Sequence, residues 1–193
     1  MPTVLAHPAV PLAIAAVVGR SAISRRLLAA GAVASMLPDL DVVGFHYGIP
    51  YAAEWGHRGF SHSLLLALFV AVVGAGFAKQ LVSTPRITFW FLLVTVASHG
   101  ILDAFTNGGL GIALLWPFSH ERFFAPLRPI EVSPLSVSGI LSVRGVAVLR
   151  SELLWVWLPC LGVAVTAVAF RYHRARTIRS GGRANAPARG PGG

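Results

Sequence analysis

The segment ITFWFLLVTVASHGILDAF, residues 87–105, is apolar along almost its whole length and contains only two ionisable side chains, His99 and Asp103. A helix needs about 20 mostly apolar residues to cross a bilayer, so this segment predicts a membrane-spanning helix. The composition of the whole chain agrees, since 55% of its 193 residues are hydrophobic and only 12% are charged. Soluble domains usually contain about 25% charged residues. Lipid is therefore the predicted solvent for most of this chain.

Four further apolar segments complete the predicted fold. Leu64–Val82 and Leu153–Phe170 are also long enough to cross a membrane. Ala9–Gly19 and Leu27–Leu37 are shorter, and at about 1.5 Å per residue neither crosses a hydrocarbon core of ~30 Å alone. They form either a partly inserted pair or parts of longer helices whose ends carry polar groups. The predicted fold class is all-α, a polytopic membrane helical bundle with three full spans and two short hydrophobic segments.

The positions of the basic residues predict how the chain crosses the cell membrane. Lysine and arginine in short connections favour the cytoplasmic side. They occur between the first and second segments, between the third and fourth, and after the fifth. This pattern predicts five alternating segments, with the N-terminus outside and the C-terminus in the cytoplasm. It places seven acidic residues at or beyond the extracytoplasmic face: Asp39, Asp41, Glu54, Asp103, Glu121, Glu131 and Glu152.

Composition divides the chain into a membrane-embedded helical domain, residues 1–170, and a basic cytoplasmic tail, residues 171–193. Residues 106–151 are predicted to be an extracytoplasmic connection or cap, in which Val137–Leu149 has the β character of a hairpin. The tail is rich in Gly, Arg, Ala and Pro, so we expect it to be disordered and its arginines to meet anionic lipid headgroups. Six of the 16 basic residues lie in this tail, and without them the net charge falls from +9 to +3. Membrane lipids are therefore expected partners, and nucleic acid is not.

Ionisable side chains gather at the predicted outer ends of the segments. His7 precedes the first segment, and PDLD, residues 38–41, follows the second. HRGFSHS, residues 57–63, precedes the third, and His99 and Asp103 end the fourth. Ionisable groups at such positions are costly and mark functional sites. The topology therefore brings polar groups from distant parts of the chain into one layer.

Two pairs of residues in this layer have a spacing that suits a metal ion. His99 and Asp103 are four residues apart, which places them on one face of a helix that Thr106 continues. Such a pair can bind a cation or simply form a hydrogen bond. Asp39 and Asp41 follow a proline two residues apart. In a helix their side chains would diverge, whereas an extended loop could gather them around a cation or leave them solvated.

HRGFSHS is the most specific element of the set. Neutral imidazoles such as those of His57 and His62 suit Zn, Fe, Ni or Mn. Arg58 offers a planar fork for phosphate or carboxylate, and Gly59 permits a close backbone approach. One of the two serines could cap the helix that follows. An interfacial anchor, with Arg and His reaching for headgroups, would explain part of this set but not all of it.

The ordered motifs resemble the YdjM-like family of inner-membrane-associated, predicted metal-dependent hydrolases. The family pattern is an N-terminal His, PDxD, HRGxSHS, HxxxDxxT with a glycine nearby, and a Trp-Pro-Phe-Ser turn. The matching positions are His7, Pro38–Asp41, His57–Ser63, His99–Thr106, Gly109 and Trp116–Ser119. The resemblance covers residues 1–120 and implies a helical membrane protein with a hydrolase site. A more distant similarity, to the all-helical zinc-dependent phospholipase C, implies phosphoester chemistry with His99 and Asp103 as its HxxxD pair.

These observations lead to the hypothesis of a membrane-bound, metal-dependent hydrolase that acts on phosphoester bonds of a lipid or lipid-linked substrate. The cofactor would be a divalent metal, zinc before others, present as one to three ions. Arg58 would orient an anionic group of the substrate, and Asp41 would be a further ligand, an orienter of a histidine or a base. A water with its pKa lowered to about 7 would attack. The predicted metal ligands are His7, Asp39, His57, His62, His99 and Asp103.

Two other functions stay open. A metal or ion transporter also needs His and Asp within the membrane, but its ligands are expected near the midplane and not at one face. A non-catalytic membrane scaffold would use the basic tail to bind a cytoplasmic partner.

Overall fold

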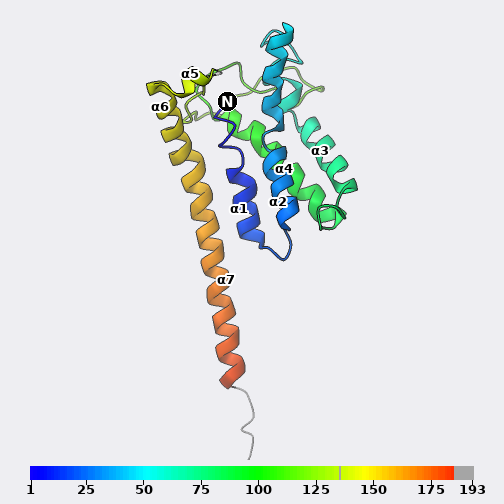
Figure 1. Ribbon diagram of the computed structural model, residues 1–193, viewed down its shortest axis with the longest axis vertical. Helices are drawn as coiled ribbons and strands as arrows, with labels where there is room; N and C mark the ends of the chain where they lie inside the picture. The colour runs from blue at the N-terminus through cyan, green and yellow to red at the C-terminus, as the bar shows by residue number, and fades with distance from the viewer. Residues whose placement is uncertain (135, 185–193) are drawn as a thin grey trace, which may run out of the picture.

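The computed structural model describes residues 1–134 and 136–184, and in this part of the chain the regular secondary structure is helical (Figure 1). Two isolated β-bridges, Thr106–Ile130 and Ile112–Phe123, lie in the connection after α4. The prediction of an all-α bundle of hydrophobic helices is confirmed. Among the elements, η1 and η2 are 3-10 helices and η3 is a π-helix. In chain order they are α1 Ala9–Val18, α2 Arg25–Ala34, η1 Leu37–Tyr47, η2 Phe60–His62, α3 Leu64–Gly76, α4 Pro85–Ala104, α5 Val137–Ile140, α6 Val143–Glu152, η3 Leu153–Trp157 and α7 Leu158–Ala184.

Three stretches of the described chain are long and apolar enough to cross a membrane, namely Arg25–Tyr47, Pro85–Ala104 and Val143–Thr177. The number of long spans agrees with the prediction, but one assignment differs. The predicted span Leu64–Val82 forms only the 13-residue helix α3. The short segment Leu27–Leu37 instead belongs to the 23-residue stretch α2–η1, whose ends carry polar groups.

Local sequence explains both differences. Gly74 and Gly76 weaken the end of α3, because glycine is a poor helix former, and the chain then turns toward α4. After α2 the chain continues as η1, with Pro38 at its start. Proline is tolerated in a first helical turn, where its missing N–H leaves no hydrogen bond unmade. Pro38 is therefore compatible with a second helical element shortly after α2.

Helix α4 is the centre of the bundle, and α1, α2 and α3 pack around it (Figure 1). The core contains Leu27 of α2, Ala67 of α3, and Phe91 and Leu92 of α4, all buried. Helices α2 and α4 approach closely at Gly31, where an added Cβ would lie 2.4 Å from the Phe91 ring. The core thus holds α2 and α3 on α4 and fixes the positions of their ends.

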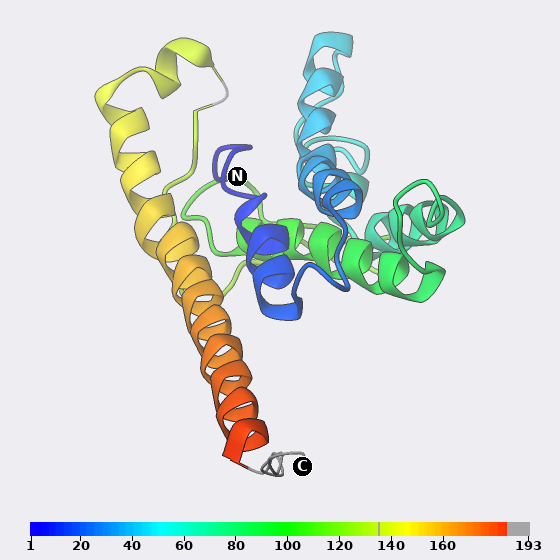
Figure 2. The same ribbon diagram turned by 60° about the horizontal axis from the view of Figure 1, so that its bottom comes forward.

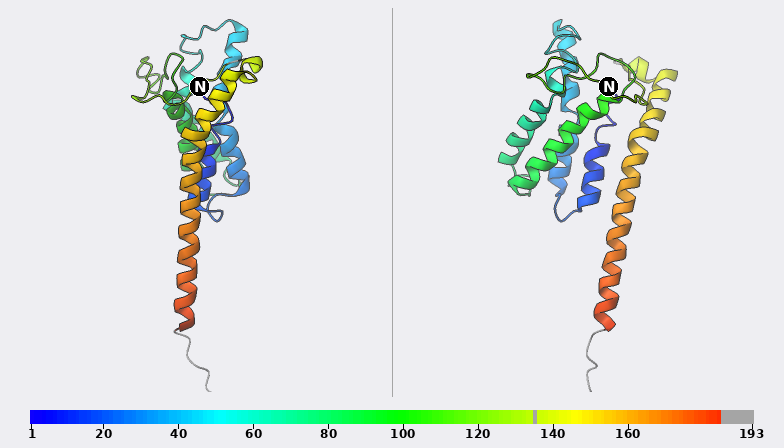
Figure 3. Two further views of the ribbon diagram at one scale, coloured as in Figure 1. Left: turned by 90° about the vertical axis from the view of Figure 1, so that its left-hand side faces the viewer. Right: turned by 180° about the vertical axis from the view of Figure 1, so that it is seen from behind.

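The helices alternate in direction, so their connections gather at two ends of the bundle (Figure 3). The end that contains the α1–α2 and α3–α4 connections carries Arg20, Arg25, Arg26, Lys79 and Arg86. The other end carries the N-terminus, η1, η2 and the C-terminal turn of α4. We call these the basic end and the His/Asp end. Which side of the membrane each end faces stays a prediction.

Elements α6, η3 and α7 form one long rod that packs on α1 and stands to one side of the bundle (Figure 2). Large apolar side chains of α7 such as Leu161 and Phe170 are exposed, which suits contact with lipid. The rod stays helical to Ala184, so the prediction of a disordered tail is wrong for residues 171–184. Arginine and alanine favour helix, and a helix that already exists propagates easily. The rest of the predicted tail, residues 185–193, lies outside the described residues.

In residues 105–134 the connection after α4 is irregular, and α5 and α6 follow from residue 137. The hairpin predicted for Val137–Leu149 is therefore wrong. Gly145, Val148 and Glu152 of α6 are buried, and their spacing of three to four residues is that of one helix face. The burial of this face outweighs the β propensity of the valines.

Candidate metal centre

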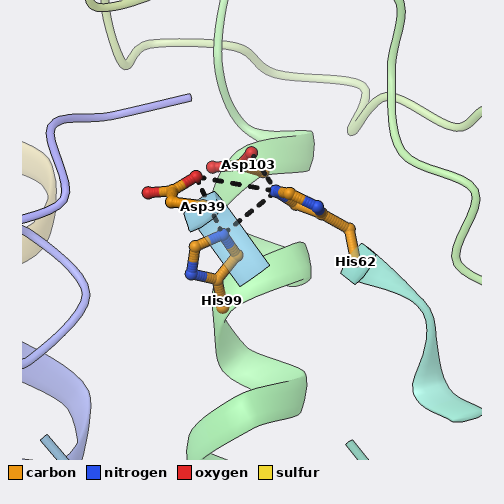
Figure 4. A group of neighbouring side chains, drawn as sticks. All are labelled: Asp39, His62, His99 and Asp103. Atoms are coloured by element: carbon orange, nitrogen blue, oxygen red, sulfur yellow. Dashed lines mark hydrogen bonds and ion pairs between the residues drawn. The ribbon is translucent and has the colours of Figure 1, made fainter. Parts of the chain in front are cut away.

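Four buried side chains converge at the His/Asp end, and Figure 4 shows them pointing toward one another. Asp39 and His62 are each 3% exposed, and His99 and Asp103 are fully buried. One nitrogen or carboxylate oxygen from each residue lies within 4.8 Å of the other three. We call these four residues the central cluster.

Three elements supply the central cluster. Asp39 lies in the first turn of η1, and His62 ends η2. His99 and Asp103 lie one turn apart on α4, as their spacing predicts. Ser63 follows His62 directly and caps α3, because its hydroxyl accepts a hydrogen bond from the Leu66 amide. This cap fixes where α3 begins, directly after His62.

Hydrogen bonds decide which ring nitrogen of each histidine faces the central cluster. His99 Nδ1 lies 2.7 Å from the carbonyl oxygen of Ser35, and His62 Nδ1 lies 3.3 Å from Asp41 Oδ2. These oxygens only accept hydrogen bonds, so each Nδ1 carries a proton. In the neutral rings both Nε2 atoms therefore present lone pairs, and they lie 3.1 Å apart. Two lone pairs at this distance need a proton or a cation between them.

The carboxylates of the central cluster also lack hydrogen-bond partners. Within the described residues, both oxygens of Asp39 and both oxygens of Asp103 are buried and accept no hydrogen bond. Buried polar atoms without a partner are rare in proteins. Imidazole nitrogens lie close to both carboxylates, with Asp39 Oδ1 3.4 Å from His99 Nε2 and Asp103 Oδ2 3.2 Å from His62 Nε2. Arg58 Nε also lies 3.1 Å from Asp103 Oδ2. The cluster thus concentrates lone pairs and negative charge where positive charge is needed.

The negative charge around His62 raises the pKa of its imidazole. Burial lowers its pKa, but the nearby carboxylates of Asp103, Asp39 and Asp41 outweigh burial and raise the pKa of His62 to about 10. A proton on His62 is therefore one way to supply the positive charge. A divalent ion would supply more of it and would replace that proton.

The spacing of the cluster atoms fits a small metal ion. Ligand atoms about 2.0–2.2 Å from a tetrahedral ion lie about 3.3–3.6 Å from one another. The separations from His62 Nε2 are 3.1 Å to His99 Nε2, 3.2 Å to Asp103 Oδ2 and 3.8 Å to Asp39 Oδ1. They bracket the tetrahedral range, so the residues present fit such an ion without rearrangement of the backbone.

Gly100 controls the distance between α4 and η2. An added Cβ there would lie 2.7 Å from the carbonyl oxygen of His62, a backbone atom that cannot rotate away. We expect Gly100→Ala to displace His62 and to weaken metal binding by about tenfold or more in a titration of the purified protein. Gly76→Ala in α3 is the matched control, because its Cβ would meet nothing within 4 Å. Equal affinities in the two variants would contradict this role of Gly100.

His7 adjoins the central cluster. Its ring stacks on His99, with ring centroids 3.6 Å apart. Its Nε2 lies 3.6 Å from Asp39 Oδ2 and 3.8 Å from Asp103 Oδ1. The other oxygen of each carboxylate, Asp39 Oδ1 or Asp103 Oδ2, is the one near His99 or His62. Burial and the neighbouring His99 lower the pKa of His7 to about 3, which keeps its ring neutral. Asp39 and Asp103 are thus arranged as carboxylates that could bridge two ions.

A second group, formed by Asp41, His57 and His62, adjoins the central cluster and shares His62 with it. Asp41 accepts hydrogen bonds from the Ser61 hydroxyl and from the Arg58 amide, and it pairs with His57 Nδ1. These contacts occupy both of its oxygens. They favour Asp41 as the residue that orients His57 and His62.

The extended loop considered for Asp39 and Asp41 is wrong, because both residues lie in the 3-10 helix η1. A 3-10 helix has about three residues per turn, so positions two apart point in different directions. Asp39 therefore enters the central cluster and Asp41 enters the second group. The divergence expected for a helix places one carboxylate in each group.

Arg58 is fully buried and bonds with groups of its own chain. Its Nε lies 3.1 Å from Asp103 Oδ2, and its two Nη atoms donate to the carbonyl oxygen of Gly108 and the hydroxyl of Thr106. Gly109 leaves room for this guanidinium, since an added Cβ would lie 2.8 Å from Nη1. These contacts make Arg58 a residue that positions Asp103, while its predicted contact with a substrate anion stays a prediction.

Other contributors to the site have no signal in the sequence. The Ser35 carbonyl that orients His99 is a backbone group, which any residue could supply. Thr3 bonds through its amide and hydroxyl to the buried Glu152 of α6, and this contact anchors the segment that carries His7. Arg122 donates to backbone oxygens of residues 51–57, including that of His57. All three depend on contacts between distant parts of the chain.

Comparisons with known proteins agree with this picture of a membrane protein. The family model described as YdjM inner membrane protein matches residues 1–176. The chain is 46% identical over 160 residues to the inner membrane protein YbcI of Escherichia coli (strain K12), a match that covers 82% of this chain and 92% of that protein. No solved structure is significantly similar to the chain.

Proposed function

This chain belongs to the YdjM family of inner membrane proteins, and we propose that it is a membrane-bound hydrolase that uses a divalent metal ion held by the central cluster. The observation that carries this proposal is the pair of Nε2 atoms of His62 and His99, 3.1 Å apart, with the buried carboxylates of Asp39 and Asp103 beside them. A purely structural network would pair each of these groups with a hydrogen-bond donor. Arg58 lies beside only one of them, Asp103. A cation satisfies all of them together.

Zinc suits the mixture of imidazole and carboxylate ligands best, although the same set accepts other divalent metals. Asp39, His62, His99 and Asp103 would hold the first ion. His7, with the outer oxygens of Asp39 and Asp103, offers a place for a second, and the group that contains Asp41 and His57 offers a third. A bound divalent ion supplies Lewis-acid activation of water and of a substrate oxygen.

The remaining polar residues prepare the centre for this chemistry. Asp41 holds the Nδ1 proton of His62, which keeps Nε2 directed at the central cluster. The Ser35 carbonyl does the same for His99. Arg58 holds Asp103 in place and balances part of its charge. These partners preorganise the site before substrate arrives.

A lipid or lipid-linked phosphoester is the substrate class that best fits this setting. The chain is a membrane protein, and a lipid could reach the His/Asp end by lateral diffusion in the bilayer. The collection of ligands at one end of the helices supports an enzyme over a transporter, whose ligands are expected near the midplane. We place the site at the extracytoplasmic face, because the basic connections at the other end favour the cytoplasm.

Hydrolysis by the purified protein tests this function. Wild-type protein in detergent should cleave a phospholipid or a chromogenic phosphodiester, lose activity with a chelator and regain it with zinc. Asp39→Asn, which removes one ligand charge without changing shape, should lower the rate by at least about 100-fold. Glu121→Asn, at an exposed position of the connection, is the control and should keep full activity. A metal-loaded wild type that cleaves neither substrate class would overturn the hydrolase proposal while leaving the metal centre intact.

A further inference from the structure

The basic end contains an apolar groove between α1 and α4 that the proposed hydrolase does not use. Its volume is about 380 Å³. Ile23 and Phe91, each 5% exposed, are its buried residues, whereas Val18, Trp90 and Val94 are about half exposed. An exposed apolar groove of this kind suits contact with hydrocarbon. The lining residues are Ile14, Val18, Ile23, Arg86, Ile87, Trp90, Phe91 and Val94.

One charged side chain breaks this apolar lining. Arg86 lies in the first turn of α4, at the basic end, and Val94 lies eight residues further along the helix. At 1.5 Å per residue these positions are about 12 Å apart along the helix axis. The groove is therefore amphipathic along its length, with a guanidinium at one extremity and apolar side chains toward the middle of the bundle.

The surroundings of Arg86 reinforce the positive charge. The neighbouring connections contribute Arg20, Arg25, Arg26 and Lys79, and the acidic residues of the central cluster lie at the opposite end of α4 (Figure 1). Arg26 bonds to the carbonyl oxygen of Gln80, which holds the α3–α4 connection against the start of α2. An anionic group that enters the groove at Arg86 thus meets positively charged surroundings.

We infer that this groove binds one molecule of an anionic glycerophospholipid, with its phosphate at Arg86 and an acyl chain against Trp90, Phe91 and Val94. The charge of Arg86 favours an anionic headgroup over a zwitterionic one, since basic residues near a membrane surface attract anionic lipid. The apolar lining, which continues toward Val94, matches a hydrocarbon chain and not a free phosphate. This site is separate from the metal centre and does not depend on hydrolysis.

Native mass spectrometry of the full chain, taken from nanodiscs of phosphatidylglycerol and phosphatidylcholine, tests the inference. Wild-type protein should retain one phosphatidylglycerol in preference to phosphatidylcholine. Arg86→Gln should lower the retained fraction about fivefold. Val94→Trp, which fills the groove and keeps Arg86, should lower it as well.

Two controls make this result specific. Arg150→Gln removes the same charge from an exposed position of α6, away from the groove and its basic surroundings, and should retain the lipid as wild type does. Val72→Trp adds the same bulk on the exposed face of α3 and should also retain it. Equal retention of both lipids by wild type, or equal retention by Arg86→Gln and Arg150→Gln, would overturn the inference.

Discussion

Purified His62→Ala protein should contain almost no divalent metal under conditions in which the wild type is loaded. His62 directs Nε2 to the central cluster and Nδ1 to Asp41, so it is the residue that the two groups share. Even residues that only orient a ligand are worth about 10–100-fold in affinity, and loss of this shared ligand should cost more than about 100-fold. Elemental analysis after dialysis, together with a metal titration, measures the effect.

His120→Ala is the matched control for this experiment. The His120 side chain is 63% exposed and pairs with Glu54 at 3.0 Å, outside both groups. We expect it to retain metal as the wild type does, so a loss confined to His62→Ala reports on the site and not on the number of histidines. Equal metal content in His62→Ala and wild type would remove the basis of the proposed function.

Replacing Arg58 by methionine should destabilise the protein strongly. Methionine keeps the aliphatic bulk but removes the charge that faces Asp103 and the donors that bond to Thr106 and Gly108. Breaking a buried ion pair costs about 3–5 kcal/mol, because the remaining charge stays buried without a partner. The midpoint of thermal unfolding in detergent should therefore fall by about 6–20 °C. Arg58→Lys should give a smaller loss, since it keeps the charge but not the planar fork.

Arg128→Met provides the comparison for this variant. Arg128 is exposed and lies over the ring of Phe124, with its guanidinium carbon 4.7 Å from the ring centroid. Its removal should change stability by less than about 0.5 kcal/mol. If Arg58→Met unfolded at the wild-type temperature yet lost activity, the charge of Arg58 would act on the substrate, as the sequence predicts, and not on Asp103.

Hydropathy predicts the fold class of this chain because apolar length is a local property. It could not predict that Leu64–Val82 stops at Gly76 or that the chain stays helical beyond Pro38, since both depend on how the ends of the helices pack and bond. The wrong prediction of a hairpin at Val137–Leu149 has a similar cause. Its valines favour strand, and the helical period becomes decisive only when a neighbouring element is there to bury it.

The members of the site were predictable to a greater extent than their arrangement. Ionisable residues in apolar surroundings are visible in the sequence, and the structure brings His7, Asp39, His62, His99 and Asp103 together. The sequence could not show that Asp39 and Asp41 enter different groups. That separation follows from the 3-10 geometry of η1, which propensity does not predict.

The order of the ligands along the chain has a consequence for biosynthesis. The cluster takes its residues from η1, η2 and α4, and its last member, Asp103, lies at the end of α4. Until a ribosome has delivered α4 to the membrane, the earlier histidines and Asp39 have no complete set of partners. The hydrogen bonds between Thr3 and Glu152 form later still, after the rod of α6, η3 and α7 has been synthesised. We therefore expect the nascent chain to acquire the proposed metal ion only after α4 has inserted, so that loading would mark a bundle that has assembled correctly.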